Sequence, residues 1–223
     1  MQATRGFLHC HMNQAAVESA IRDCIDRAEA GGVTLGGMLD QLGRAGFCFA
    51  ALLLAMPFIQ PFSLGPLTMI GGVTFMVIGW QMGTGQARPA LPAAALNLKI
   101  HGRAWVGVLS FCIRILTFCR RFTRVRMDHW VSGERGERFV GWLILMGGAL
   151  LAVPVANPPF NNTLPALMIL CACIGWLERD GLMVLVSLAW GVVTLLYFTA
   201  VAFAVIFFGK QIFDWLGRIW PFH

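Results

Sequence analysis

The chain has 223 residues, of which 57% are hydrophobic and 13% are charged, and its formal net charge is +6. A soluble domain carries about 25% charged and about 45–50% apolar residues, so this composition excludes an ordinary soluble domain. It also excludes a disordered chain, a coiled coil and a disulfide-stapled secreted module. We therefore predict an all-α, polytopic integral membrane protein. The positive charge is interpreted as orientation by the positive-inside rule and contact with anionic lipid headgroups, and nucleic acid is not an expected partner.

The N-terminal region, residues 1–44, is predicted to be amphipathic and helical. It lacks the apolar core of a signal peptide, because acidic residues interrupt it. One helix is expected over 13–30, where apolar and charged residues recur at helical spacing. A second, short helix is expected from Thr34, a good N-cap residue, to about Gly43.

The membrane domain is predicted to cover 45–208 and to contain two charge-free helical hairpins. Each hairpin has two apolar arms around a proline-rich tip that no helix can cross. In chain order, the predicted segments are the hairpin 45–84 with arms 45–58 and 66–83, the basic amphipathic helix and loop 102–138, the hairpin 139–177 with arms 139–153 and 163–176, the helix 181–208 and the interfacial tail 209–223. The helix 181–208 would be about 42 Å long, more than one bilayer core of about 30 Å. It is therefore expected to be tilted, or broken near Gly191.

The two hairpins share an order of features that indicates an internal repeat. Each runs from an Ala-Leu-rich arm through proline and a polar amide to a second proline, and ends in Gly-Trp at 79–80 and 175–176. Each is followed by one further apolar helix, so the repeat unit would be a hairpin plus a helix.

Two membrane arrangements stay open at this stage. In the first, the hairpins enter from opposite sides with re-entrant tips, and segment 104–120 crosses the membrane with Arg114 lining the bundle interior. In the second, each arm with its tip is about 18–20 residues long and just spans the membrane. Both hairpins then lie on the same side, and segment 104–120 lies in the interface with Arg114 in water. The second arrangement satisfies the positive-inside rule better, because it gathers the basic loops in the cytoplasm.

No catalytic or metal-binding motif is visible, so we expect no enzymatic activity, no cofactor and no metal. The candidate polar or transport positions lie beside or within apolar segments: Arg114, Glu178, Arg179, Asp180, Gln60, Gln81, Asn157 and Asn162. Asp180 either caps the following helix while Glu178 pairs with Arg179, or the three contact an ion or a headgroup. The tip amides either satisfy backbone groups near proline or coordinate a polar substrate. The glycine pairs 71–72 and 147–148 predict close helix packing, within one chain or between chains, so a homo-oligomer stays open.

Three pieces of the sequence carry a family resemblance. They are Leu177-Glu178-Arg179-Asp180-Gly181, the arm from Gly71 to Gln81, and the loop Arg88-Pro89-Ala90-Leu91-Pro92. With the hairpins, over roughly 34–208, they resemble the exopolysaccharide synthesis ExoD family of bacterial membrane proteins. The resemblance implies a multi-pass inner-membrane protein that acts in exopolysaccharide synthesis or secretion, with that machinery as a partner, and it implies no known reaction or catalytic residue. The alternative function is a small inverted-repeat transporter or ion-coupled carrier.

Overall fold

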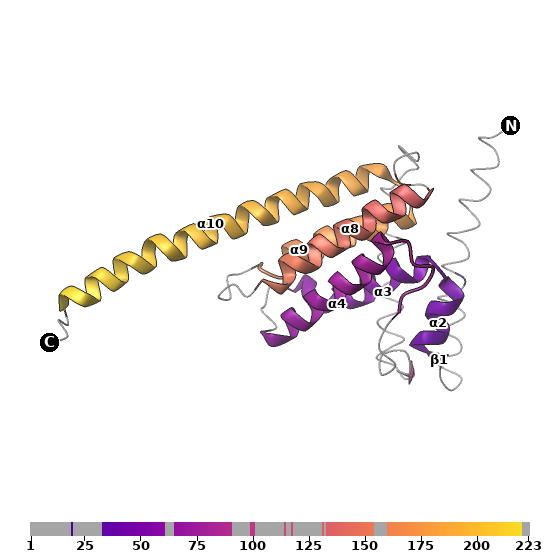
Figure 1. Ribbon diagram of the computed structural model, residues 1–223, viewed down its shortest axis with the longest axis horizontal. Coiled ribbons are helices and arrows are strands. Elements are labelled where there is room, and N and C mark those ends of the chain that lie inside the picture. The colour runs from indigo at the N-terminus through magenta and orange to yellow at the C-terminus, as the bar shows by residue number, and fades with distance from the viewer. Residues whose placement is uncertain are drawn as a thin grey trace.

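The computed structural model describes residues 33–60, 65–90, 99–100, 133–153 and 160–219, together with Ser19, Arg114, Thr117 and Val131. These residues are almost entirely helical (Figure 1). The exception is an antiparallel pairing of two dipeptides, β1 (Val33–Thr34) and β2 (Lys99–Ile100). The helix predicted over 13–30 lies outside the described residues apart from Ser19.

The short helix α2 (Leu35–Leu42) begins and ends at the two capping residues that the sequence predicts. The Thr34 hydroxyl accepts a hydrogen bond from the Gly37 backbone N–H at 3.2 Å, which caps the first turn. Gly43 ends the helix with φ of 53°, a conformation that favours glycine. The prediction of a short helix from Thr34 to Gly43 is confirmed.

Both hairpins form helices where the charge-free runs predict them. The first contains α3 (Ala45–Ala55), the 3₁₀ turn η1 (Met56–Ile59) and α4 (Pro66–Gly83). The second contains α8 (Gly133–Ala152) and α9 (Thr163–Leu177). One boundary is corrected: α8 begins at Gly133, six residues before the predicted arm, so 134–138 form helix and not basic loop.

Helices α4 and α8 approach each other so closely that their backbones touch. A Cβ atom added to Gly72 would lie 2.7 Å from the Gly148 carbonyl oxygen, and one added to Gly79 would lie 2.6 Å from that of Gly141. Both distances are below the ordinary van der Waals range, so only glycine fits there. The two glycines of each helix are seven residues apart, which is about two turns. This packing joins the two hairpins within one chain.

The two hairpins point in the same direction. The Thr163 hydroxyl at the start of α9 donates hydrogen bonds to the carbonyls of Ile59 (3.3 Å) and Gln60 (3.1 Å), so the two tips meet. At the opposite end of the bundle, Arg44 before α3 forms an ion pair with Glu137 of α8 at 2.7 Å. We call these the tip end and the charged end. The arrangement with opposed hairpins is therefore wrong, since α4 ends and α8 begins at the charged end (Figure 1).

The last helix, α10 (Gly181–Ile219), is 39 residues long and passes through Gly191 without a break. It runs antiparallel to α9, and the Ser187 hydroxyl donates to the Met168 carbonyl at 2.8 Å. It then continues past the tip end of the bundle, away from the other helices (Figure 1). The segment expected to be an interfacial tail, 209–223, is helical as far as Ile219.

Candidate functional site

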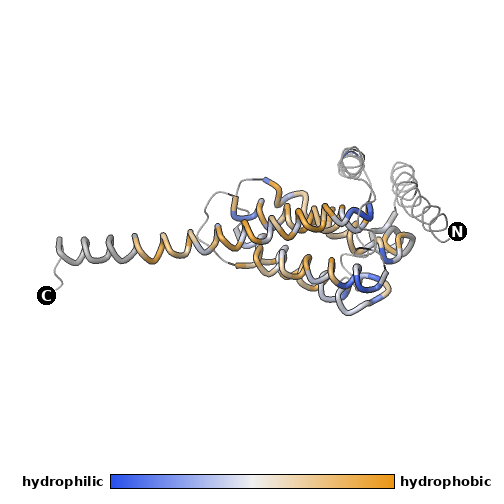
Figure 2. The backbone as a smooth tube through the Cα atoms, turned by 90° about the horizontal axis from the view of Figure 1, so that it is seen from above, coloured by the Kyte–Doolittle hydropathy of each residue, from blue (hydrophilic) through white to orange (hydrophobic). Residues whose placement is uncertain are grey.

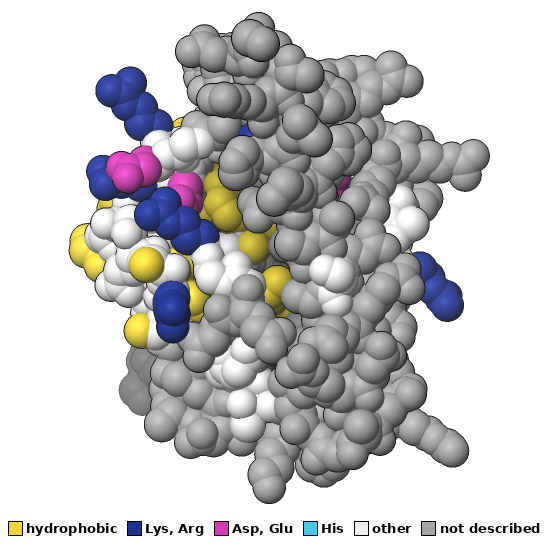
Figure 3. All heavy atoms as spheres, turned by 90° about the vertical axis from the view of Figure 1, so that its right-hand side faces the viewer, with side chains coloured by type: hydrophobic (Ala, Val, Ile, Leu, Met, Phe, Trp, Pro, Cys, Tyr) yellow, Lys and Arg dark blue, Asp and Glu magenta, His cyan; other side chains and the backbone are white. Residues whose placement is uncertain are grey.

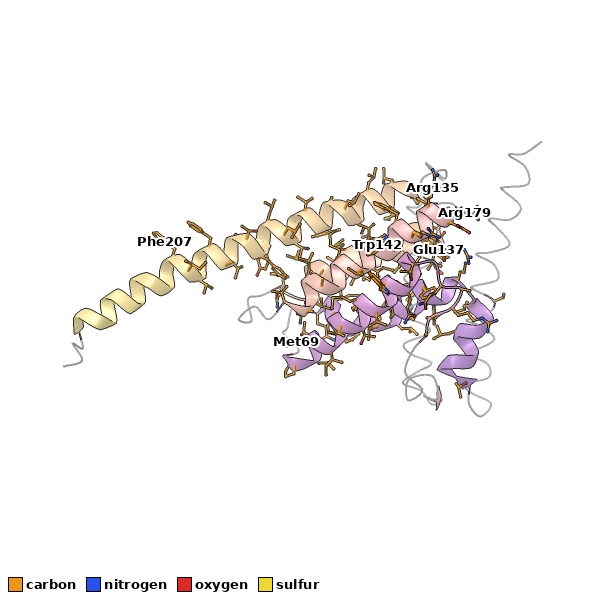
Figure 4. All side chains as sticks on the ribbon, viewed as in Figure 1. Met69, Arg135, Glu137, Trp142, Arg179 and Phe207 are labelled. Atoms are coloured by element: carbon orange, nitrogen blue, oxygen red, sulfur yellow. The ribbon has the colours of Figure 1, made fainter. Side chains whose placement is uncertain are left out.

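The charged end gathers side chains from every helix of the bundle. Figure 3 shows basic and acidic side chains together on this face, and Figure 4 shows Arg135, Glu137 and Arg179 at one end of the structure. The stretches 45–87, 139–177 and 181–209 contain no charged residue, so the charges flank the helices at this end. Figure 2 shows the resulting pattern, with hydrophilic segments at the ends of the bundle and apolar helices between them.

An ion pair joins the two hairpins at the charged end. Arg44 donates from Nη1 to Glu137 Oε2 at 2.7 Å, and the Glu137 side chain is only 6% exposed, whereas the Arg44 side chain is 49% exposed. The other carboxylate oxygen, Glu137 Oε1, is buried and has no hydrogen-bond partner among the described residues. Cys48 of α3 and Cys173 of α9 are buried free thiols. Sequence reasoning missed this ion pair, although the few acidic residues within the arginine-rich 120–138 region were a signal for it.

The turn between α9 and α10 contains three candidates, Glu178, Arg179 and Asp180. The Asp180 carboxylate accepts a hydrogen bond from the Leu182 N–H at 2.9 Å and so caps α10. Glu178 and Asp180 are buried, and Arg179 adopts a left-handed conformation with φ of 51°. The capping interpretation of Asp180 is confirmed, and the pairing of Glu178 with Arg179 stays a prediction.

Gln81 holds the segment after α4 in place. Its amide nitrogen donates to the Ala90 carbonyl at 2.9 Å, and its amide oxygen accepts from the Ala90 N–H at 2.7 Å. The side chain is buried, and Pro89 of the same segment lies against Gly46 of α3. Because both groups of the Gln81 amide bond to backbone, this residue positions the 86–90 segment at the charged end.

The tip amides form a second polar group of residues. Gln60 is exposed at the end of η1, and Asn161 and Asn162 are buried just before α9. The Asn161 side-chain oxygen and the hydroxyl of Thr68 on α4 have no hydrogen-bond partner among the described residues. Asn157 lies outside the described residues. Backbone carbonyls at the tip do accept side-chain hydrogen bonds, but the donor is the hydroxyl of Thr163, which sequence reasoning did not single out for this role.

Arg114 does not take the position expected for a residue inside the bundle. It is helical and exposed, which agrees with the arrangement in which its stripe faces water. Most of segment 104–120 lies outside the described residues. Among the residues that the structure describes, no group of three His, Cys, Asp or Glu side chains is arranged to hold a metal ion.

Apolar side chains cover the outside of the bundle. Trp80 of α4 and Trp142 of α8 pack edge to face, with ring centroids 5.6 Å apart, close to the charged end. The exposed face of α4 beyond them is apolar, and its large side chains are Leu67, Met69, Ile70, Val73 and Val77. In α10, the stretch Gly181–Phe207 is long and apolar enough to cross a membrane. This exterior is typical of contact with lipid.

Comparison with known proteins places the chain in a family. A family model described as "Exopolysaccharide synthesis, ExoD" matches residues 17–200. Protein ExoD of Rhizobium meliloti (strain 1021) is 28% identical over 198 residues, which cover 89% of this chain and 82% of that protein. No solved structure matches. The chain therefore belongs to the ExoD family of exopolysaccharide synthesis proteins.

Proposed function

We propose that the protein is an integral protein of the bacterial inner membrane that takes part in exopolysaccharide synthesis or secretion. The observation that carries the proposal is the family match over 17–200, which includes the whole hairpin bundle. The apolar outer face of α4 and the long apolar helix α10 support the membrane location. The arginines at the charged end support a cytoplasmic position for that end.

The proposed role is accessory, not catalytic, and the partner is the exopolysaccharide synthesis or export machinery. The accessory role is supported by two carboxylates at the charged end that have structural partners: Asp180 caps α10, and Glu137 pairs with Arg44. The contact of the two tips removes the basis of the inverted-repeat transporter, which needs opposed hairpins.

We also propose that the two hairpins are an internal repeat. Exchanging the hairpins would replace α3 by α8 and α4 by α9. The same exchange converts the packing of α4 on α8 into the packing of α9 on α3, and both contacts are present. Because both tips lie at one end, the repeat axis would run along the bundle, as in parallel repeats.

The test is deletion of the gene followed by complementation. Deletion is expected to change the amount or the size distribution of exopolysaccharide, and the wild-type chain is expected to restore both. Glu137→Gln and Asp180→Asn chains are expected to restore them as well, because neither carboxylate is assigned a proton-transfer step. An unchanged polysaccharide after deletion would refute the proposed function. Loss of complementation by a variant that accumulates normally would refute the accessory role.

A further inference from the structure

We infer that the two hairpins enter the bilayer from the charged side and end inside it, so that α10 alone among the described helices reaches the far side. The inference rests on the proposed membrane location and adds the depth of each element. The tips and α10 would contact the hydrocarbon of the bilayer, and in the far leaflet lipid would surround α10 on every side.

The charged end marks the level of one membrane interface. Arg135 and Arg138 are exposed there, and the Trp80–Trp142 pair lies next to them, with the side chains 54% and 45% exposed. Tryptophan is enriched at the headgroup level of membrane proteins, with charged residues on the aqueous side of it. From this level, the depth of each helix follows from its length.

The hairpin arms are short compared with the bilayer. Helix α9 has 15 residues and α4 has 18, which correspond to about 22 Å and about 27 Å. The apolar part of α8, 139–152, rises about 21 Å. By contrast, Gly181–Phe207 of α10 has 27 residues and rises about 40 Å. A bilayer core of about 30 Å accommodates that stretch at a tilt of about 40°, and α9, antiparallel to it, then reaches a depth of only about 17 Å.

Beyond the tips, no other described part of the chain packs against α10. The contacts of Met168 with Ser187 and Gly191 set the register between α9 and α10, which brings the start of α9 near Leu196. Beyond this point the helix stays apolar for about 18 Å, and Leu196, Phe203 and Ile206 are 65%, 70% and 60% exposed. Figure 4 shows Phe207 far from the bundle. If the hairpins crossed the whole bilayer, this apolar stretch would stand in water.

The tips themselves are suited to the membrane interior. The tip sequences 59–66 and 153–163 contain no charged residue, whereas loops that face water usually do. Irregular backbone at membrane depth is tolerated where protein buries it. The Thr163 hydroxyl donates to carbonyls of the first tip, and Asn161 is buried. Phe160 and Val153, in contrast, are exposed and apolar.

The experiment measures depth in vesicles of phosphatidylcholine and phosphatidylglycerol. Full-length protein without its native cysteines carries one bimane-labelled cysteine at a time, as Phe160→Cys, Phe207→Cys or Phe139→Cys. Phe139 is exposed near the charged end and serves as the shallow control. Quenching is compared between lipids spin-labelled near the headgroup and lipids spin-labelled deep in the acyl chain. Val153→Cys replaces Phe160→Cys if the latter aggregates.

At the tip, the deep quencher is expected to be at least twofold more effective than the shallow one. At 139 and 207 the order is expected to reverse. A shallow tip, or a tip labelled by a membrane-impermeant maleimide from the far side, would overturn the inference, because the hairpins would then span. A cross-link between chains at 207 without lipid quenching would overturn it too, because a second copy would cover α10. If no position is quenched by either lipid, the membrane location and the proposed function fail together. An unchanged polysaccharide after deletion would refute the proposed function alone, because the depth measurement does not depend on it.

Discussion

The close contact of α4 and α8 makes a quantitative prediction about Gly79. An alanine Cβ at this position would lie 2.6 Å from the Gly141 carbonyl oxygen and would also press on the Leu145 backbone nitrogen. Both are backbone atoms, which cannot turn away as a side chain can. The two helices must therefore separate by about 1 Å, and a gap of that size forfeits a quarter to a half of each dispersion contact.

We expect Gly79→Ala to lower the free energy of unfolding by about 1–3 kcal/mol, the usual cost of overpacking a tight interior. The better helix propensity of alanine, about 1 kcal/mol, offsets part of the gross cost. Gly191→Ala is the matched control. It is also a buried helical glycine, but its nearest neighbours are the flexible sulfur and methyl group of Met168, at 3.2 and 3.3 Å. The control is expected to be neutral or slightly stabilising.

The assay is thermal unfolding of the purified protein in detergent. For a chain of this length, each kcal/mol corresponds to about 2–4 °C in Tm. Gly79→Ala is therefore expected to melt several degrees below both the wild type and Gly191→Ala. Equal melting temperatures for the two variants would refute the backbone contact between the hairpins. A change of oligomeric state at unchanged Tm would instead assign these glycines to contacts between chains.

Two further variants test the charged end. Arg44→Met leaves the Glu137 carboxylate buried without its partner, so it is expected to lower the free energy of unfolding by about 3–5 kcal/mol. The double variant Arg44→Met/Glu137→Met is expected to lose less, and Arg135→Met, at an exposed position, is expected to have little effect. A different order of the Tm values would contradict the ion pair. Gln81→Leu removes both bonds to Ala90, so hydrogen exchange at the Ala90 amide is expected to accelerate at least tenfold, and unchanged exchange would show that Gln81 does not hold the segment.

The positions of the helices could be predicted from local signals. Charge-free runs bounded by proline and glycine placed the arms of both hairpins, and Thr34 and Asp180 marked two caps. The start of α8 could not be predicted in this way, because Glu134–Arg138 is polar on most sides and resembles a loop. In the structure, Glu137 of this stretch pairs with Arg44, which is 93 positions away in the sequence, and such a distant contact leaves no local signal.

The arrangement of the hairpins was not predictable for a different physical reason. A helix that is apolar on all sides has no amphipathic periodicity, so its sequence does not indicate which face meets a neighbour. Helices α3, α4 and α9 are of this kind. The remaining signal is the position of small residues, and the spacing of seven between Gly72 and Gly79, and between Gly141 and Gly148, was the pattern that could have paired α4 with α8.

Parts of the three pieces that carry the family resemblance come together at one end of the molecule. The 177–181 turn, Gln81 and the Ala90 segment that it holds are far apart in the sequence, yet all lie at the charged end. Among the described tip residues, the Thr163 hydroxyl bonds to backbone carbonyls and Asn161 and Asn162 are buried, whereas Gln60 is exposed. If the hairpins end inside the bilayer, the charged end is also the only part of the bundle that water-soluble partners can reach. If the proposed partner is the exopolysaccharide machinery, it would then meet the protein at the charged end, which the glycine contacts of α4 and α8 hold together.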